Sequence, residues 1–383
     1  MWFRNLSLSR KITSALLLAG LIPMLIVSIL SFKIANSQLE QQAFSQLQSV
    51  RDIKASAIKR YFAQMENQII TLAESTQTIE AASAFARIFP RIVRASGYNP
   101  EEIQNLKNGI KDFYVNEFGQ EYKNRNEGAQ ANIPALMQNL SAEAIVLQHQ
   151  YIFSNSHPLG EKHLLNAAEG RSVYHGTHAN YHPNFRNFLG KFGYYDIFLL
   201  DTQGNIVYSV YKELDFGTSL IDGPYADSNF ASAFKTANTL NKGETFTEDF
   251  KTYHPSYDAP ASFIASPIFR GEERVGVLVF QIPLETVNAI MSERSGMGET
   301  GESYLIGGDF LMRSDSFLAP KTHSVVASFR HPNSGSVNTI AAKEALAGKS
   351  NTQVITDYNG NSVLSAYAPL NLPMFEWAIL AEI

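Results

Sequence analysis

The chain has 383 residues, no cysteine, and 31 basic against 36 acidic residues, a formal net charge of -5 at pH 7. This length exceeds one typical domain, and the lack of cysteine excludes disulfides, thiol catalysis and cysteine-ligated zinc. A chain without a global basic surface is not expected to bind nucleic acid.

A membrane anchor is predicted at the N-terminus. Residues 12–32 form a run of 21 residues without a charge, close to the roughly 20 that cross a hydrocarbon core of about 30 Å. Residues 1–11 carry only basic charges, at Arg4, Arg10 and Lys11, so the positive-inside rule keeps this tail in the cytoplasm and exports the remainder. The alternative is a cleaved signal peptide, but its apolar region is typically only about 7 to 15 residues long. We therefore expect an anchor.

The next region, residues 33–192, is predicted to be helical. Residues 33–85 contain neither proline nor glycine. Apolar side chains, among them Leu39, Leu47, Ile53 and Ile69, recur every three or four residues, the period of one helix face. A long helix continuous with the anchor is expected, and its apolar stripe packs either on its own domain or on a second copy of the chain. Shorter helices are expected at 101–123 and 133–153.

Three histidines in this region could form a metal site. His175, His178 and His182 stand at i, i+3 and i+7, a spacing that places three imidazoles on one face of a helix. Gly176 and Pro183 weaken the helix that this site needs. We therefore expect these histidines to line a polar interior or to cap elements near the following strands, and we expect no metal and no other cofactor.

Strand patterns dominate from residue 193 onward. Residues 194–211 read as a β-hairpin, because two aromatic and β-branched runs flank a polar turn at 201–205. A helix and three strands follow, which predicts a small antiparallel sheet with a helical cover. A similar order then repeats. The expected later elements are helices at 224–240, 284–294 and 338–347, and strands at 245–252, 261–269, 275–282, 310–314, 352–357, 362–369 and 376–382. A further strand is expected toward the end of 296–307, before a turn at 308–309.

The second of these units carries a family resemblance. Residues 298–306, Gly-Glu-Thr-Gly-Glu-Ser-Tyr-Leu-Ile, resemble the opening of the membrane-proximal lobe of double Cache (dCache) sensor domains, and 367–370 with 375–380 resemble its closing strands. The resemblance implies an α+β fold, in which a transmembrane helix, a long stalk helix and a helical section precede two PAS-like Cache lobes with antiparallel sheets. The membrane-distal lobe is expected at 193–286 and the membrane-proximal lobe at 287–383.

This family includes bacterial methyl-accepting chemotaxis proteins, so the resemblance implies the periplasmic sensor of a homodimeric chemoreceptor in the inner membrane. A sensor histidine kinase or nucleotide cyclase ectodomain is the alternative, and a membrane-tethered metal-binding or scaffolding protein is an alternative of another class. No nucleophile elbow, His-Glu-x-x-His, P-loop or Rossmann fingerprint occurs, so we expect no enzyme.

A small-molecule ligand is expected in the distal lobe. Carboxylates there can pair with an ammonium group, and tyrosine faces add cation–π contacts, which favours an amine-bearing ligand. Amino-acid-binding members of the family use a Tyr-x-x-x-Arg-x-Trp-Tyr pattern, from which residues 181–188 depart by one residue of spacing and by the missing Trp-Tyr pair. The candidate ligand contacts are Arg186, which could grip a carboxylate, and Asp196, Tyr208, Tyr211, Glu213, Asp215, Tyr225, Asp227, Asp249, Tyr253 and Tyr257.

Overall fold

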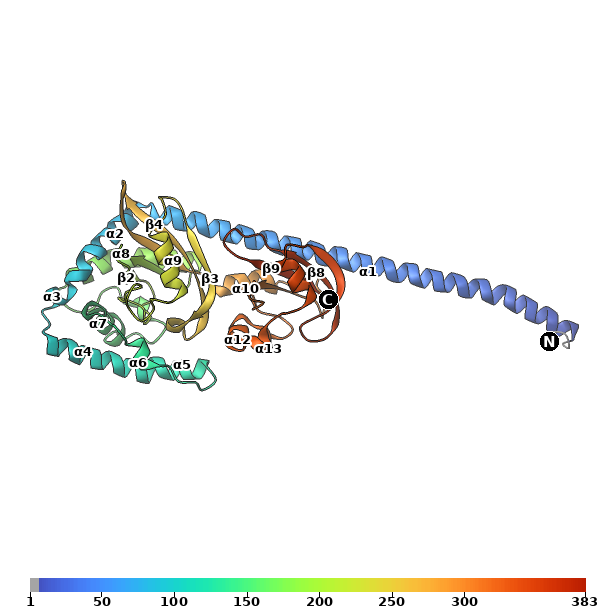
Figure 1. Cartoon of the computed structure of the whole chain (residues 1–383), viewed down its shortest axis with the longest axis horizontal. Helices are drawn as coiled ribbons and strands as arrows, with labels where there is room; N and C mark the ends of the chain where they lie inside the picture. Colours follow the sequence, from blue (N-terminus) through green and yellow to red (C-terminus); the bar gives the residue numbers. More distant parts are fainter. Residues whose placement is uncertain (1–6) are drawn as a thin grey trace.

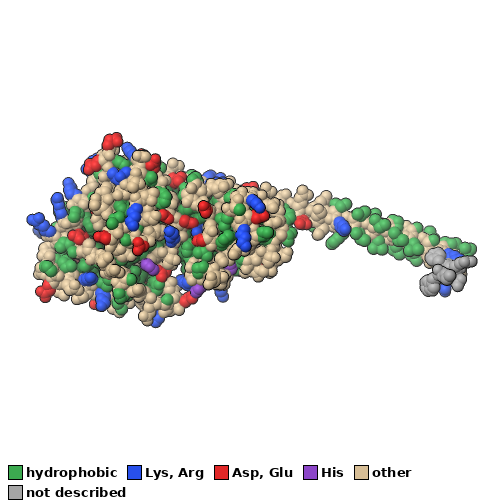
Figure 2. All heavy atoms as spheres, viewed as in Figure 1, with side chains coloured by type: hydrophobic (Ala, Val, Ile, Leu, Met, Phe, Trp, Pro, Cys, Tyr) green, Lys and Arg blue, Asp and Glu red, His purple; other side chains and the backbone are tan. Residues whose placement is uncertain are grey.

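One helix, α1 (Leu8–Ala73), extends along most of the length of the molecule, and two antiparallel sheets lie beside its second half (Figure 1). The structure is a computed structural model that describes residues 7–383, so most of the predicted cytoplasmic tail lies outside the described residues. Residues 12–32 lie on the part of α1 that projects away from the sheets, where apolar side chains cover the surface (Figure 2). By length and composition α1 can cross a membrane.

The second half of α1 packs against both sheets. Its buried side chains recur at helical spacing from Leu47 to Ala73. Only three residues of the expected apolar stripe are among them, because most of the buried face is offset from that stripe by one residue. Leu39 and Ile53 of the expected stripe are 64% and 68% exposed. The helix ends earlier than expected. Ser75 breaks it by capping α2 (Thr76–Ile88), and its hydroxyl accepts a hydrogen bond from the Thr78 amide, as serine commonly does at a helix start.

A helical section then folds back over the end of the first sheet (Figure 1). The helix predicted at 101–123 is confirmed, with a π-helical turn inside it, while the helix predicted at 133–153 is interrupted at residues 137–141. Pro183 lies inside a 20-residue helix, so the expected weakening of that helix was wrong. The elements are η2 (Phe89–Arg91), α3 (Ile92–Ser96), α4 (Pro100–Phe113), η3 (Tyr114–Phe118), α5 (Gly119–Arg125), α6 (Ile133–Leu136), α7 (Ala142–Gln148), η4 (His149–Phe153), η5 (Lys162–Leu164) and α8 (Val173–Phe192).

The first lobe is a five-stranded sheet in the order β2-β1-β5-β4-β3. The predicted hairpin is confirmed: Phe198 pairs with Ser209, and the Asp201 carboxylate accepts hydrogen bonds from the turn amides of Gln203 and Asn205. α9 packs on β3 and β4, and α2 packs on β5. The elements are β1 (Asp196–Leu200), β2 (Ile206–Ser209), α9 (Asn229–Ala237), β3 (Phe246–Tyr253), η6 (His254–Ser256), β4 (Ala259–Arg270) and β5 (Glu273–Gln281).

The second lobe is a four-stranded sheet in the order β6-β9-β8-β7, so the predicted α+β fold is confirmed. The strand predicted at 310–314 is wrong: only Met312 bridges back, to Ile306. The backbone hydrogen-bond ladder between this segment and the preceding strand is interrupted, because the Ser314 hydroxyl accepts the hydrogen bond of the Leu305 amide. The elements are α10 (Leu284–Ser292), β6 (Glu302–Gly307), α11 (Pro320–His323), α12 (Val325–Arg330), α13 (Pro332–Gly335), α14 (Ile340–Leu346), β7 (Asn351–Thr356), β8 (Ser362–Pro369) and β9 (Trp377–Glu382).

A buried lysine joins α1 to the second lobe, and its substitution should destabilise the protein. Lys54 is 6% exposed and donates hydrogen bonds to the carbonyls of Met291 and Glu293 and to the Ser303 hydroxyl. Lys54→Met should lower the free energy of unfolding by about 2 kcal/mol or more, because buried acceptors lose their donor. Urea unfolding of the detergent-solubilised chain measures this, with the exposed Lys59→Met on the same helix as control. Equal losses would contradict the role of Lys54.

Candidate functional site

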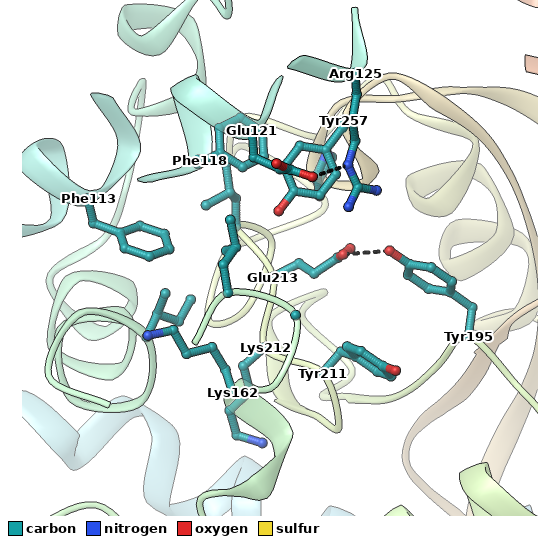
Figure 3. Close-up of a pocket in the computed structure, with 15 residues that line it drawn as sticks. Phe113, Phe118, Glu121, Arg125, Lys162, Tyr195, Tyr211, Lys212, Glu213 and Tyr257 are labelled. Atoms are coloured by element: carbon teal, nitrogen blue, oxygen red, sulfur yellow. Dashed lines mark hydrogen bonds and ion pairs between the residues drawn. The ribbon is translucent and has the colours of Figure 1, made fainter. Parts of the chain in front are cut away.

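A cavity of about 400 Å³ opens beside the hairpin of the first lobe (Figure 3). We call it the hairpin pocket. Its walls come from the segment that follows β2, from the π-helical turn η3 with α5, and from residues 255–257 after β3. Its volume lies within the range of about 300 to 1,000 Å³ that is usual for small-molecule sites. It is lined by Phe113, Phe118, Glu121, Arg125, Ile152, Leu159, Gly160, Lys162, Tyr195, Tyr211, Lys212, Glu213, Leu214, Pro255 and Tyr257.

Two stacked aromatic pairs form opposite walls of the pocket. The rings of Tyr195 and Tyr211 are 5.6 Å apart at 16°, and those of Phe118 and Tyr257 are 4.8 Å apart at 18°. Tyr257 reaches its position from a left-handed backbone conformation with φ of 58°, which is uncommon for a bulky residue and marks a constrained turn. These ring faces can hold an apolar or cationic ligand group.

Glu213 is the carboxylate between these walls. Its Oε1 accepts a hydrogen bond of 2.7 Å from the Tyr195 hydroxyl (Figure 3). Its Oε2 accepts one of 3.2 Å from the Ser256 hydroxyl. Within residues 7–383 no basic side chain forms an ion pair with it. Burial, together with the charge of Asp215, raises the pKa of Glu213 well above its usual value. A carboxylate left without a counter-charge in such surroundings favours a cationic partner.

The basic groups of the pocket are held by other partners. Arg125 forms a 2.6 Å ion pair with Glu121 at the rim, and its guanidinium lies 4.4 Å from the centre of the Tyr257 ring. The ammonium of Lys162 donates to the Asn155 carbonyl, and that of Lys212 donates to the carbonyls of Ser209 and Val210. The pocket therefore presents one unpaired carboxylate and cations that already have acceptors.

Two further buried carboxylates lie behind Glu213. Asp196 is fully buried, and its Oδ1 accepts hydrogen bonds from the backbone amides of Ile197, Val210 and Tyr211, which fixes the hairpin exit. Asp215 is also fully buried and accepts a 2.6 Å hydrogen bond from the Tyr253 hydroxyl. Burial raises the pKa of both carboxyl groups. They therefore add negative potential beneath the pocket when ionised.

The structure brings part of the predicted ligand set together. Tyr211, Glu213 and Tyr257 line the pocket. Asp215 and Tyr253 form the hydrogen-bonded pair behind it, and the ring of Tyr225 packs 6.1 Å from that of Tyr253. Ligand contact by these residues stays a prediction.

The other predicted residues lie elsewhere. Tyr208 is buried against α8, where its hydroxyl is 2.7 Å from His182 Nδ1. Arg186 donates to the carbonyls of His163 and Leu164 outside the pocket lining. Asp227 is exposed on the loop before α9. Asp196 serves the hairpin backbone, and Asp249 pairs with Arg313 of the second lobe.

Five polar lining residues were not predicted. Tyr195 and Lys212 belong to the hairpin segments themselves, so their positions beside Tyr211 and Glu213 could have identified them. Glu121, Arg125 and Lys162 come from the helical section. Nothing in their local sequence indicates that this section folds over the first lobe.

The three histidines lie on α8 and are hydrogen-bonded within the protein. Nδ1 of His175 is 2.9 Å from the Tyr151 hydroxyl, Nδ1 of His178 is 2.6 Å from the Asn166 carbonyl, and Nε2 of His182 is 2.7 Å from the His163 carbonyl. His182 also contacts Tyr208 on β2, as expected for a role near the hairpin. Across residues 7–383 no group of three or more histidine, cysteine or acidic side chains is arranged to hold a metal ion.

Solved structures show a weak overall likeness to this chain. The ligand-binding domain of the Pseudomonas fluorescens chemoreceptor CtaA in complex with L-serine is 17% identical, with a TM-score of 0.35 and coverage of 71% of this chain and 96% of that one. The sensor domain of the V. cholerae histidine kinase DctB is 14% identical, with a TM-score of 0.37 and coverage of 69% and 94%.

Sequence comparisons identify the family. A probable chemoreceptor, y4sI of Sinorhizobium fredii, is 26% identical over 196 residues, which are 50% of this chain but only 22% of that relative. The Cache domain family dCache_1 matches residues 116–383, well over half of the chain and both sheets. The resemblance read from residues 298–306 is thereby confirmed, and the chain belongs to the dCache_1 family of Cache domains.

Proposed function

We propose that this chain is the sensor part of a bacterial transmembrane chemoreceptor and that an amine-bearing small molecule binds in the hairpin pocket. The family match and the relative named as a probable chemoreceptor support the sensor class. The observation that carries the ligand class is Glu213, a carboxylate without a basic partner in the described chain, set between two stacked aromatic pairs. Carboxylate and ring faces together suit an ammonium group.

The proposed location follows from α1. Residues 12–32 would cross the bacterial inner membrane, with residues 1–11 in the cytoplasm and both lobes in the periplasm. The second lobe lies nearer the projecting end of α1 (Figure 1), so the first lobe and its pocket would be distal to the membrane. We propose a homodimer in which the exposed Leu39 and Ile53 of α1 meet a second copy.

Signalling would use the packing of α1 on both lobes. A ligand that favours one arrangement of the lobes shifts the population of that arrangement, and a continuous helix can carry the change through the membrane. The match covers only 22% of the length of the named chemoreceptor. Chemotaxis as the output is therefore proposed for this chain and does not follow from that relative. A kinase or cyclase output is the alternative. We propose no enzymatic activity for this chain itself.

A ligand screen tests the ligand class. The full chain in detergent is melted with amino acids and polyamines, and in parallel with organic acids and purines. We expect an amine to raise the melting temperature, because a ligand at 100 times its Kd adds about 2.7 kcal/mol of stability. Stabilisation by amine-free compounds alone, or by none of the panel, would contradict the proposal.

A further inference from the structure

A second cavity, of about 320 Å³, lies in the helical section and shares no lining residue with the hairpin pocket. We call it the helical-section pocket. Its walls are the π-helical turn η4, the loop at 154–156, the connection at 165–169, and the turn between α3 and α4. It is lined by Tyr98, His149, Gln150, Ser154, Asn155, Ser156, Leu165, Ala167, Ala168 and Glu169.

The walls are held in place by the protein itself. Asn155 is 4% exposed, and its amide donates hydrogen bonds of 2.9 Å to the carbonyls of Tyr151 and Lys162. On the other side, the carbonyl of Asn166 is 2.6 Å from Nδ1 of the buried His178. A cavity whose walls are fixed without a ligand loses little conformational entropy on binding.

A π-helical turn and an unpartnered oxygen point to a ligand. His149 and Gln150 belong to η4, and single π-turns within helices occur frequently at functional sites. Gln150 Oε1 is buried and has no hydrogen-bond partner among the described residues. Buried polar atoms are usually paired, so this acceptor calls for a donor. Gln150 lines the cavity, and a turn of its side chain toward the cavity would bring this oxygen to a ligand hydroxyl.

The lining defines the ligand class. It holds amide, hydroxyl and imidazole groups with one carboxylate, Glu169, and no lysine or arginine. Burial lowers the pKa of His149, so its imidazole is neutral at pH 7 and can both donate and accept. An anionic ligand would find no counter-charge and would be repelled by Glu169.

We propose that the helical-section pocket is a second binding site, for an uncharged hydroxyl-rich small molecule of the monosaccharide class. Each hydroxyl of such a ligand donates and accepts, which matches the groups in the wall. The half-buried ring of Tyr98 offers an apolar face for the sugar ring. The site is independent of the amine proposed for the hairpin pocket.

Calorimetry on the full chain in detergent tests this proposal. The probes are D-glucose, D-galactose, D-ribose and myo-inositol, with D-glucuronate as the charged counterpart. We expect saturable binding of at least one neutral probe and none of glucuronate. Gln150→Met keeps the size of the side chain but removes its amide, and it should weaken binding about tenfold or more. Tyr98→Ala serves as a second variant.

Further variants locate the bound sugar. Glu213→Gln in the hairpin pocket should leave sugar binding unchanged, and each variant is melted first to confirm folding. The proposal is overturned if no neutral probe binds, or if Gln150→Met and Tyr98→Ala both fold and bind as the parent does. It is also overturned if Glu213→Gln abolishes the binding, because the sugar would then occupy the hairpin pocket. A failed amine screen has no bearing on these results.

Discussion

Glu213→Gln is expected to weaken amine binding by about 30-fold or more while the protein stays folded. Glutamine keeps the size of the side chain, and its one carbonyl oxygen can accept the hydrogen bond of the Tyr195 hydroxyl. Its NH2 group then faces the Ser256 hydroxyl, which can accept as well as donate. Glutamine cannot supply the negative charge, and removing one partner of a desolvated charge pair costs about 2 kcal/mol or more. Calorimetry with the amine found in the ligand screen measures the loss.

The pH dependence of binding tests the same group. Because burial raises the pKa of Glu213, the empty pocket carries a proton at pH values where a free glutamate has lost it. An ammonium ligand must displace that proton, so affinity falls as pH drops below the raised pKa, by about tenfold per pH unit at the limit. Above that pKa, affinity levels off. The variant Glu213→Gln should show a clearly weaker dependence, which comes only from the buried carboxyl groups of Asp196 and Asp215.

Glu272→Gln is the matched control for this prediction. Glu272 is exposed in the turn between β4 and β5, so the same loss of charge there should leave affinity and its pH profile unchanged. If Glu213→Gln binds the amine as the parent does, the carboxylate has no part in recognition, whichever compound the screen has found.

The sequence predicts the elements of this fold better than their mutual positions. Both faces of β1 are buried, so its continuous apolar pattern identifies a strand, and the Asp201 turn fixes the hairpin. The early end of α1 depends on Ser75, one polar residue within a long apolar pattern. Such a cap competes locally with the helical period and is easily overlooked.

The candidate site was harder to predict for a physical reason. Glu213 and Tyr211 follow a strand of the sheet, where polar residues are conspicuous, but Arg125 and Glu121 come from helices that are distant in sequence. Their place over the hairpin depends on long-range packing, such as the hydrogen bond of Gln148 to the Leu214 carbonyl. Asp249 was predicted to contact the ligand, but it joins the two lobes instead. An acidic residue in a strand can join two lobes as readily as it can bind a ligand.

Asp249→Ala is expected to destabilise the protein by about 3 kcal/mol, because it breaks the ionic contact between the lobes. Asp249 on β3 accepts hydrogen bonds of 3.0 and 2.9 Å from Nε and Nη2 of Arg313, and one of 3.0 Å from the Trp377 indole. Arg313 is 3% exposed and lies directly against Gly307, where a Cβ would be 2.3 Å from the guanidinium. Breaking a fully buried pair typically costs about 3 to 5 kcal/mol, and the Asp249 side chain is 29% exposed, which lowers the expected cost within this range. Asp309 remains as a partner of Arg313, so we expect a loss of stability near the lower end of this range.

The comparison with Asp309→Ala decides whether the contact between the lobes is responsible for the loss of stability in Asp249→Ala. Asp309 also pairs with Arg313, at 3.0 Å, but it is 45% exposed, and exposed pairs contribute only about 0 to 1 kcal/mol. Urea unfolding should therefore show a much larger loss for Asp249→Ala. A double variant with Arg313→Met should be less unstable than the sum of the single variants, because the unpaired charge is gone with its partner. Equal losses for the two aspartates would mean that the lobes are held by apolar packing along α1 instead.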